Sequence, residues 1–512
     1  MTGAWFDVYL YRKKWSICLY DNLIVTIGWT DRRKKLINCF RNFSDVITKY
    51  ILGIVFSVFF ILALVVKAMY SFDDSPYFTF NKWYDFVFIV LCGTGVFLML
   101  KNREFIQNHI NFKVMFCIYM VIAICYIYLV PLTPFSDMEH MYKAAVEIAT
   151  GNVRNVYQDP YWTTFGGNIY LAFFYGIILI PLPKSIISIK VVNALMVYIF
   201  IYLISDIAKE YGVKYNKLLF IFLLFFSPLF LYINHIYFDI PFLFFEILAL
   251  YIYKKQKNLI YMSIPLVFAC FLRLNGFIIL LAVLLSIVFK KEKIKKAKMM
   301  EMVFLCIIVF FIPTGVKKTI DMLYVPDVLP SYPALNQVYI GLNEKEFGFM
   351  DNDLSYERNW DDIINRVEDY GPTKLTKIIG KKTFWLWTQG TYQAERYAFG
   401  SDVSNELDKF EYKTVATKHL MSNDQIARKL INSFMRAQYL ILFLGMVINI
   451  LFSMYKKSDI ESERELYYIL IGTLLIMLIW ELKSRYIIMC IPPMAIMAQL
   501  GFEHVLKLKE QI

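Results

Sequence analysis

Long, uninterrupted runs of apolar residues dominate the chain, and short polar segments separate them. Each run has about 15 to 20 residues, the length that an α-helix needs to cross the hydrocarbon core of a bilayer. Because the runs are continuous and not alternating, a transmembrane β-barrel is excluded. The pattern predicts an all-α polytopic membrane protein with about twelve crossings, two of them in a hairpin at 259–289. The other predicted spans are 50–70, 84–100, 114–131, 188–205, 218–234, 240–253, 301–316, 437–455, 466–482 and 486–503.

One apolar segment, 169–182, is predicted not to cross. Basic residues mark cytoplasmic loops, which places the loop at Lys209 inside and the loop at Asp137 outside. The chain must therefore cross an odd number of times between these two loops, and the clear span at 188–205 accounts for one crossing. Segment 169–182 is thus expected to be a re-entrant or interfacial helix packed under the outer loop.

The apolar block 259–289 is interrupted by F-L-R-L-N-G at 271–276 and has basic clusters at both ends. Both ends are therefore predicted to be inside, with two short helices forming a hairpin. At 1.5 Å per residue each arm spans little more than about 20 Å. The turn, which carries Arg273, is expected to lie below the outer surface, where a lone cation needs a partner.

The spans and loops divide the chain into four regions. Residues 1–49 are predicted to be a basic cytoplasmic segment, and 50–316 a transmembrane domain whose outer loop, 131–168, carries the chemistry. Residues 317–435 are too long for a simple connector and are predicted to form an extracytoplasmic cap. Residues 436–512 complete the predicted bundle with C-terminal transmembrane helices.

Composition agrees with this class. The chain of 512 residues is 58% hydrophobic and only 19% charged, with a net charge of +12. Its Lys and Arg residues lie in short loops, which indicates topology signals and attraction to anionic lipid and argues against nucleic acid as a partner. The eight cysteines are scattered, so neither a disulfide framework nor a metal site is predicted, and no cofactor is expected. The first 45 residues are mixed and basic, which is not the pattern of a cleavable signal peptide. Abundant Ile, Lys, Phe, Tyr and Asn favour an AT-rich bacterial genome and a multi-pass protein of the cell membrane.

The stretch 131–162 draws attention because Asp137, Glu139 and His140 follow directly after a predicted span. Titratable side chains at the end of a membrane span are energetically unfavourable, so their presence there indicates a function. We predict that Asp137 is the base of a membrane-embedded transferase, with Glu139 and His140 binding substrate. The alternative is helix capping, since S-D-M-E precedes a helix-like run.

Further polar residues are expected at the same outer face, and each has a simpler alternative. His235 could be an interfacial hydrogen-bonding residue and Asp239 a helix start. Lys381 and Lys382 beside Phe384, Trp385 and Trp387 could be an interfacial anchor, and Glu481 with Arg485 a local i,i+4 pair. Together, carboxylates and cations suit transfer from an anionic leaving group, because a base takes a proton from the acceptor and fixed cations stabilise the departing phosphate. The candidates are Asp137 and Asp239 for catalysis, and Glu139, His140, His235, Arg273, Lys382, Glu481 and Arg485 for substrate binding.

The order of these features resembles the GT-C superfamily of polyprenyl-phosphate-sugar-dependent glycosyltransferases, which includes protein O-mannosyltransferases and aminoarabinose transferases. The resemblance covers roughly 110–500. It lies in S-D-M-E-H-M-Y-K-A-A from Ser136, S-P-L-F-L-Y to F-D-I-P-F-L-F-F-E at 227–246, F-L-R-L-N-G at 271–276 and E-L-K-S-R-Y-I-I-M-C-I-P-P at 481–493.

The resemblance implies a GT-C-like bundle, an aspartate base at Asp137, a second acidic position at Asp239 and a lipid-phosphate contact at Arg485. Two features depart from the family. Two spans precede the part that resembles its first span, and Met138 separates Asp137 from Glu139 where the O-mannosyltransferases have adjacent acids.

The predicted function is an inverting glycosyltransferase that moves a sugar from a polyprenyl-phosphate donor to a lipid, glycan or protein acceptor of the cell envelope, on the extracytoplasmic face. A polymerase or ligase of envelope polysaccharide is one alternative, in which Arg358, Arg366 and Arg396 would carry the function. A lipid or sugar flippase or transporter is another, and it predicts ionisable groups through the full depth of the bilayer.

Overall fold

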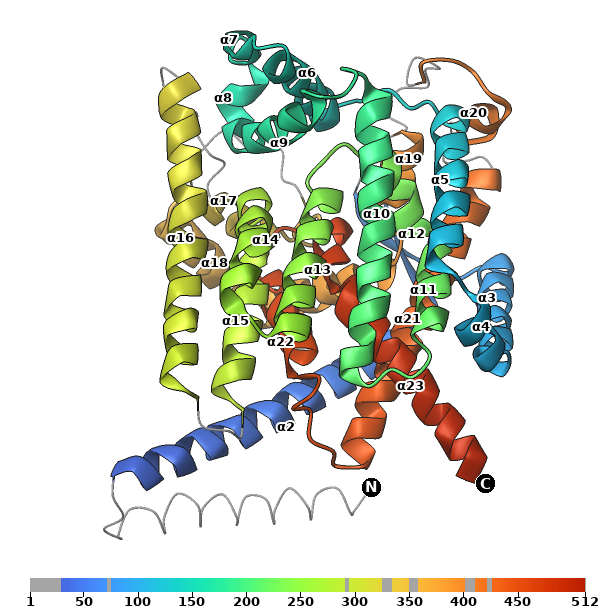
Figure 1. The fold of residues 1–512 in the computed structure, drawn as a ribbon, viewed down its shortest axis with the longest axis vertical. Coiled ribbons are helices and arrows are strands. Elements are labelled where there is room, and N and C mark those ends of the chain that lie inside the picture. Colours follow the sequence, from blue (N-terminus) through green and yellow to red (C-terminus); the bar gives the residue numbers. More distant parts are fainter. Residues whose placement is uncertain are drawn as a thin grey trace.

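The computed structural model describes residues 29–70, 75–290, 294–324, 334–349, 358–400, 410–420 and 426–511. The first 28 residues of the predicted N-terminal segment and parts of the predicted cap lie outside these ranges. The described chain is almost entirely helical, with one two-stranded antiparallel hairpin (Figure 1).

The first half of the described chain contains both long helices and groups of consecutive short helices. The elements are α2 (Trp29–Ala63), β1 (Val66–Tyr70), β2 (Pro76–Phe80), α3 (Trp83–Lys101), α4 (Arg103–His109), α5 (Phe112–Leu129), α6 (Asp137–Ala149), α7 (Val153–Val156), α8 (Tyr161–Phe165), the 3-10 helix η1 (Gly166–Asn168), α9 (Ile169–Leu179), α10 (Ile186–Ala208), η2 (Lys209–Tyr211), α11 (Asn216–Leu224), α12 (Ser227–Leu231) and η3 (Tyr232–Asn234).

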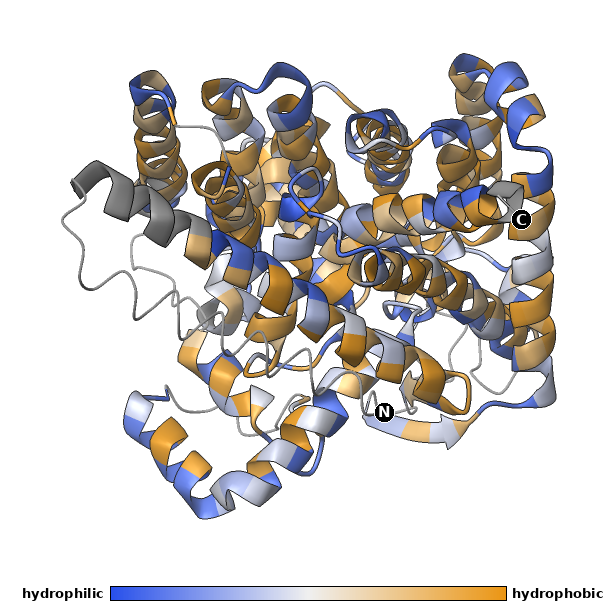
Figure 2. Cartoon of the chain, turned by 90° about the horizontal axis from the view of Figure 1, so that it is seen from below, coloured by the Kyte–Doolittle hydropathy of each residue, from blue (hydrophilic) through white to orange (hydrophobic). Residues whose placement is uncertain are grey.

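The second half continues the bundle. Its elements are α13 (Asp239–Gln256), α14 (Leu259–Leu272), α15 (Gly276–Val288), α16 (Lys296–Tyr324), α17 (Ala334–Gly341), α18 (Trp360–Gln389), α19 (Ala394–Phe399), α20 (Val415–Leu420), α21 (Ile426–Tyr455), α22 (Arg464–Met477), η5 (Ser484–Cys490) and α23 (Ile491–Gln511). Figure 2 shows that apolar residues predominate along the long helices.

Seven helical segments among the described residues are long and apolar enough to cross a membrane, or eight if the bent pair α11 and α12–η3 is one span. This supports a helical, multi-pass membrane fold but not a count of twelve. The predicted spans at α14, α15 and α22 have only 13 or 14 residues, and α13 carries four charged side chains. The seven segments are Cys39–Ala63, Trp83–Lys101, Phe112–Leu129, Ile186–Tyr211, Lys296–Ile320, Ile426–Tyr455 and Ser484–Leu508.

The β-hairpin differs from the sequence prediction, which continued the first span to residue 70. Helix α2 ends at Ala63, and the segment V-K-A-M-Y is a strand that pairs with 76–80. The buried Lys67 explains the early end, because its Nζ lies 2.6 Å from Oδ1 of Asp85 at the start of α3. A straight continuation of the helix would not turn this ammonium group back toward α3.

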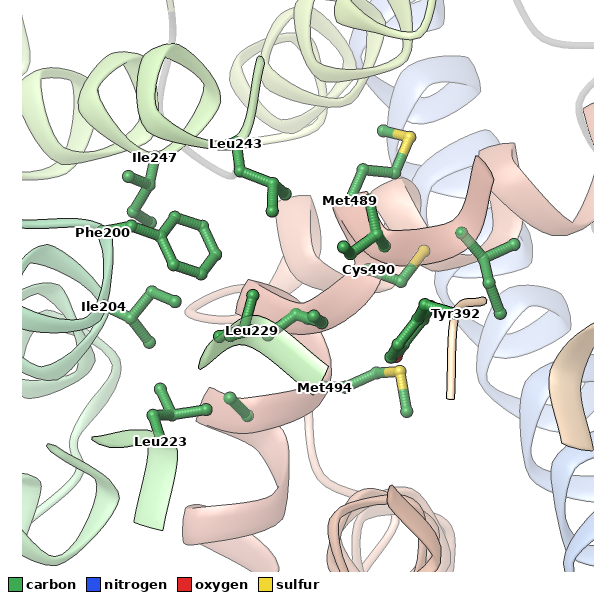
Figure 3. Packing of buried hydrophobic residues seen from close by; sticks show 14 of the residues in the cluster. Phe200, Ile204, Leu223, Leu229, Leu243, Ile247, Tyr392, Met489, Cys490 and Met494 are labelled. Atoms are coloured by element: carbon green, nitrogen blue, oxygen red, sulfur yellow. The ribbon is translucent and has the colours of Figure 1, made fainter. Parts of the chain in front are cut away.

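One large apolar core holds the bundle together, and it includes part of the predicted cap. Figure 3 shows Tyr392, which belongs to the polar region between α16 and α21, beside Cys490 and Met494, and the same apolar cluster includes Phe200 of α10 and Leu243 of α13. Trp385 and the other buried aromatic residues of this region belong to the same core cluster. The described residues 385–399 thus contribute to the bundle interior and do not form a detached cap.

The central crossing of α21 and α23 depends on two glycines. A Cβ atom added to Gly501 would lie 2.1 Å from the carbonyl oxygen of Gly445, which is far inside van der Waals contact. Only a residue without a side chain allows this close approach of the two backbones. The crossing fixes the direction of η5, because η5 leads directly into α23.

A second, smaller apolar cluster lies beneath α6–α9, which gather at one end of the bundle (Figure 1). Its buried residues include Met138, Trp162, Leu171 and Tyr175 from this layer, together with Leu272 from α14. The predicted non-crossing segment is α9, which packs against α6. This layer forms one wall of the candidate site.

The segment that leads into this layer is tied to a distant part of the chain. Glu411 donates its backbone N–H to the carbonyl of Pro131 at 2.9 Å, and the Thr414 hydroxyl donates to the carbonyl of Leu129 at 2.6 Å. The buried Lys190 of α10 donates to the carbonyl of Leu132 at 2.7 Å. These bonds fix the chain just before α6 begins.

Candidate functional site

Asp137 is the first residue of α6 and is half-buried. Ser136 precedes it with φ of 52°, in the left-handed region that is uncommon for residues other than glycine. The Ser136 side chain makes no capping hydrogen bond, so the capping explanation of S-D-M-E finds no support in its geometry. The carboxylate benefits from the positive end of the helix dipole without serving as the N-cap.

A chain of hydrogen bonds runs from Asp137 across α8 and η1. The Tyr161 hydroxyl is hydrogen-bonded to Asp137. Asn168 donates from Nδ2 to the hydroxyl oxygens of both Tyr161, at 2.6 Å, and Tyr237, at 3.3 Å. The amide group of Asn168 therefore links the Asp137 layer to the segment between η3 and α13.

His140 contacts Tyr161, the first tyrosine in this series of hydrogen bonds. Its Nδ1 lies 2.5 Å from Oδ2 of Asp159, and its ring stacks on Tyr161 with a centroid distance of 4.2 Å. Glu139 instead points to the exposed side of α6 and pairs with Lys143 at 2.5 Å. Of the two predicted neighbours of Asp137, His140 thus holds Tyr161 in place, and Glu139 is a surface residue.

His235, Asp239 and Arg273 form a buried cluster on the other side of this layer. His235 Nε2 lies 2.9 Å from Asp239 Oδ2, and Arg273 lies 2.8 Å from Oδ1 of the same carboxylate as an ion pair without well-aligned hydrogen-bond geometry. His235 and Asp239 are 1% and 0% exposed. The His235 Nδ1 is 3.4 Å from the sulfur of Met138, which follows Asp137 in the chain. Asp239 is therefore the partner that the sequence required for Arg273.

The local fold explains why these groups face each other. The carbonyl groups of Ile233 and His235 accept hydrogen bonds from Asn193 of α10, and that of Tyr237 accepts one from Tyr175 of α9. These bonds satisfy carbonyl groups at the end of η3 and in the buried, irregular segment 235–238 that follows it. Arg273 ends α14, where the backbone becomes extended.

Burial and pairing shift the titration of this cluster. Burial lowers the pKa of His235 to about 4, against the opposing effect of the Asp239 carboxylate. Burial raises the pKa of Asp239, but Arg273 and the His235 hydrogen bond outweigh it and lower the pKa to about 2. At neutral pH the cluster therefore holds a neutral imidazole, a carboxylate and a guanidinium group.

Arg485 in η5 is buried among aromatic rings. Its guanidinium carbon lies 4.6 Å from the ring centroid of Tyr237, 5.5 Å from that of Tyr397 and 5.8 Å from that of Tyr486. It is 6% exposed, and its Nε has no hydrogen-bond partner within the described residues. Asp239 and Arg396 both act on it electrostatically. Arg485 is thus a buried cation that no carboxylate neutralises directly among the described residues.

Glu481 and Lys382 lie beside this cage and have other partners. Glu481 accepts a hydrogen bond from the Tyr486 hydroxyl at 2.8 Å and pairs with Lys483 at 2.9 Å, so it forms no i,i+4 pair with Arg485. Lys382 is fully buried and donates to the carbonyls of Gly341, at 2.5 Å, and Trp480, at 3.1 Å. Lys382 is therefore not an interfacial anchor; it holds the loop that precedes Glu481.

Tyr237 is the point where these groups meet. Burial raises the pKa of its phenol, and Asp137, Arg485 and Arg273 all lie close enough to act on it. The structure thus brings Asp137, Asp239, His235, Arg273 and Arg485 around one tyrosine. The polymerase or ligase hypothesis relies on Arg358, Arg366 and Arg396, which do not lie together. Arg358 and Arg366 both lie over the ring of Tyr339 in α17, whereas Arg396 lies near Arg485.

Sequence reasoning missed the neutral members of the site, which are Tyr161, Asn168, Tyr237 and Tyr397. Two weak signals were available: Tyr237 stands between His235 and Asp239, and Tyr161 follows Asp159 in the stretch D-P-Y-W. Asn168 and Tyr397 have no local signal. Within the described residues no group of three His, Cys, Asp or Glu side chains could hold a metal ion.

The site therefore belongs to a multi-pass helical membrane protein in which paired and unpaired charges meet under a layer of short helices. Comparison with known proteins adds no relative, since no family model, curated protein or solved structure matches the chain.

Proposed function

We propose that the protein is a membrane glycosyltransferase of the GT-C type, which transfers a sugar from a polyprenyl-phosphate donor to a cell-envelope acceptor on the extracytoplasmic face. The observation that carries the proposal is the Arg485 guanidinium group, which is buried among three tyrosine rings and whose Nε has no hydrogen-bond partner in the part of the chain that the structure describes. A buried cation in this state is costly unless an anion arrives to pair with it. A phosphate at the end of a lipid is such an anion, and guanidinium groups bind phosphate well.

In the proposed reaction, Asp137 removes the proton from an acceptor hydroxyl group. The hydroxyl oxygen forms a bond to the anomeric carbon while the bond from that carbon to the phosphate oxygen breaks, with inversion. The electron pair leaves with the phosphate, which Arg485 stabilises. Asp137 suits the role of base because it is half-buried and hydrogen-bonded to one phenol.

Asp239 has a different role in this proposal. Its two carboxylate oxygens already face His235 and Arg273 at 2.9 and 2.8 Å. It orients Arg273 and keeps that guanidinium group directed at the site, as a positioning residue. Replacement of Asp239 would leave Arg273 buried without its partner, so loss of activity there would include loss of structure.

Two observations bear on the alternatives. Arg396 acts electrostatically on Arg485, as expected for a polysaccharide ligase that uses arginines. Glu246 of α13 is fully buried two helical turns from Asp239, and neither of its oxygens has a hydrogen-bond partner within the described residues. This carboxyl group favours a transporter, which needs ionisable groups deep in the bundle.

The test uses the full chain in nanodiscs with a panel of synthetic polyprenyl-phosphate hexoses and pentoses, and measures release of polyprenyl phosphate. Asp137→Asn is expected to lower the rate about 100- to 10,000-fold, the usual contribution of a general base. Arg485→Gln is expected to lower kcat/KM for the donor about 10- to 100-fold.

Glu139→Gln is the matched control, because it removes a carboxylate from the same turn of α6 on the exposed side. It should leave the rate unchanged. Normal release by Asp137→Asn at normal protein levels would refute the assignment of the base, and Arg396→Gln as the only inactive variant would favour the ligase.

A further inference from the structure

Tyr237 carries a buried hydroxyl group whose hydrogen atom has no acceptor among the described residues. Within that part of the chain, the one hydrogen bond of this hydroxyl comes from Asn168, whose Nδ2 lies 3.3 Å from the phenolic oxygen. In this bond the amide group donates and the phenolic oxygen accepts. A phenol also carries one hydrogen atom of its own, so the Tyr237 hydroxyl can still donate.

The direction of the bond from Asn168 follows from Asp137, where the series of hydrogen bonds begins. This step rests on the proposed function, which makes Asp137 a carboxylate that only accepts, so the single hydrogen atom of the Tyr161 hydroxyl points to it. The Tyr161 oxygen, 2.6 Å from Asn168 Nδ2, can then only accept, which turns the NH2 group of Asn168 toward both phenols. Tyr237 therefore receives a hydrogen bond from Asn168 and keeps its own hydrogen atom for another acceptor.

The Tyr237 phenol lies where the reacting groups of the proposed transfer would meet. Asp137, Arg485 and Arg273 all act on it electrostatically, and the guanidinium carbon of Arg485 lies 4.6 Å from its ring centroid. Burial raises the pKa of this phenol well above its ordinary value, so it keeps its hydrogen atom at neutral pH. A buried donor without an acceptor is unfavourable unless a bound molecule supplies one.

We propose that Tyr237 donates a hydrogen bond to an oxygen of the lipid-borne phosphate that Arg485 binds, as a second and uncharged contact to that group. A hydrogen bond from a hydroxyl to a charged oxygen is shorter and stronger than one between neutral groups. The phenol gives up no proton in the reaction. It stabilises the charge that develops on the phosphate as the bond to the anomeric carbon breaks.

The test measures binding of polyprenyl phosphate and of the uncharged polyprenol to the full chain in nanodiscs, so that neither the sugar nor the acceptor needs to be known. The wild type should bind the phosphate more tightly than the alcohol. Tyr237→Phe keeps the ring beside Arg485 but removes the hydroxyl, and it should reduce this preference about 10- to 100-fold, the usual contribution of a hydrogen bond to a charged group. Binding of the alcohol should stay unchanged, which a general loss of structure would not allow.

Tyr486→Phe is the matched control. Tyr486 also lies beside the Arg485 guanidinium group, whose carbon is 5.8 Å from its ring centroid, but its hydroxyl already donates to Glu481 at 2.8 Å. Because this hydrogen atom is engaged within the protein, Tyr486→Phe should keep the wild-type preference for the phosphate.

Asn168→Asp provides a second test, which leaves the Tyr237 hydroxyl in place. A carboxylate at position 168 accepts the hydrogen atom of the Tyr237 hydroxyl and so withdraws it from the phosphate. The added negative charge acts on the phosphate whether or not that hydroxyl is present, so the effect of Asn168→Asp is measured both in the wild type and in Tyr237→Phe. It should be larger in the wild type, and the difference between the two backgrounds isolates the contribution of the hydrogen atom.

The outcomes separate this proposal from the proposed function. Equal binding of the phosphate and the alcohol by the wild type would overturn both, because both depend on the anion site. A wild-type preference in Tyr237→Phe, together with its loss in Arg485→Gln, would overturn the role of Tyr237 alone. An equal effect of Asn168→Asp in both backgrounds would show that the Tyr237 hydrogen atom is not directed at the phosphate.

Discussion

At the scale of single residues, the two buried arginines of the candidate site have different surroundings. Arg273 lies 2.8 Å from a fully buried carboxylate, so its charge is compensated within the fold. Arg485 faces aromatic rings, which attract a cation far less than a carboxylate does. The first arrangement is complete within the fold, whereas the Nε of Arg485 has no hydrogen-bond partner among the described residues. This difference makes Arg485 the better candidate for contact with substrate.

The His235–Asp239 pair leads to a prediction on pH. The pKa of His235 falls from 6.5 to about 4 on folding, so the unfolded chain binds more protons between these values. Stability should therefore be complete above pH 6.5 and decline as the pH falls toward 4, by on the order of 3 kcal/mol. The corresponding window for Asp239, from 3.8 down to about 2, lies below this range.

Thermal unfolding in detergent at pH 7.5 and pH 4.5 measures this effect. His235→Gln keeps a donor for Asp239 but cannot take up a proton, so its melting temperature should differ less between the two pH values than that of the wild type. The same decrease in both proteins would place the titrating group elsewhere.

The sequence predicted the charged residues of the site but not their neutral links. Arg273 and Asp239 could be selected as candidates from the sequence, because a charged side chain within an apolar run is costly unless it has a partner or a function. Tyr237 and Asn168 carry no such signal, since tyrosine and asparagine are common at the ends of membrane helices. Their role depends on η1 meeting the 235–238 segment, which is a property of the tertiary structure.

At the scale of elements, the lengths of the apolar runs predicted the kind of helix better than the ends of the runs predicted where each helix ends. The interrupted block 259–289 suggested two short helices, and the structure has α14 and α15 with Arg273 between them. The end of α2 was missed, because the apolar pattern continues through a strand that a buried ion pair turns away from the helix axis. Hydropathy cannot register such a turn.

The crossing of α21 and α23 gives a prediction at this scale. Gly501→Ala would place a Cβ atom 2.1 Å from the Gly445 carbonyl oxygen, so the helices must separate. We expect a loss of stability of about 2 kcal/mol or more, because overpacked cores shift the backbone.

Gly315 provides the control, since a Cβ atom there meets no other atom within 4 Å. Gly315→Ala should be neutral or slightly stabilising, because alanine favours the helix by about 0.5–1 kcal/mol. Melting temperatures of the two variants in the same detergent compare them directly. Equal values would show that the α21–α23 contact has room for a methyl group.

At the scale of the whole molecule, the gathering of α6–α9 at one end of the bundle defines a test of topology (Figure 1). If α9 does not cross, Lys184 just beyond it lies on the same face as Asp137. Lys184→Cys, in a chain without other cysteines, should then react in intact cells with a maleimide that cannot cross the membrane.

Lys457→Cys is the control for the opposite face, because it lies in an exposed loop that the positive-inside rule assigns to the cytoplasm. It should react only after the cells are permeabilised. The same behaviour at position 184 would make α9 a full crossing.

The bonds that residues 411 and 414 make to Pro131 and Leu129 have a consequence for biosynthesis. A ribosome delivers α6 long before it delivers the segment that fixes the start of that helix. During elongation the start of α6 therefore lacks its final support, and a chain that stops before residue 411 lacks these bonds altogether. The order of synthesis thus delays completion of the candidate site until most of the chain has been made.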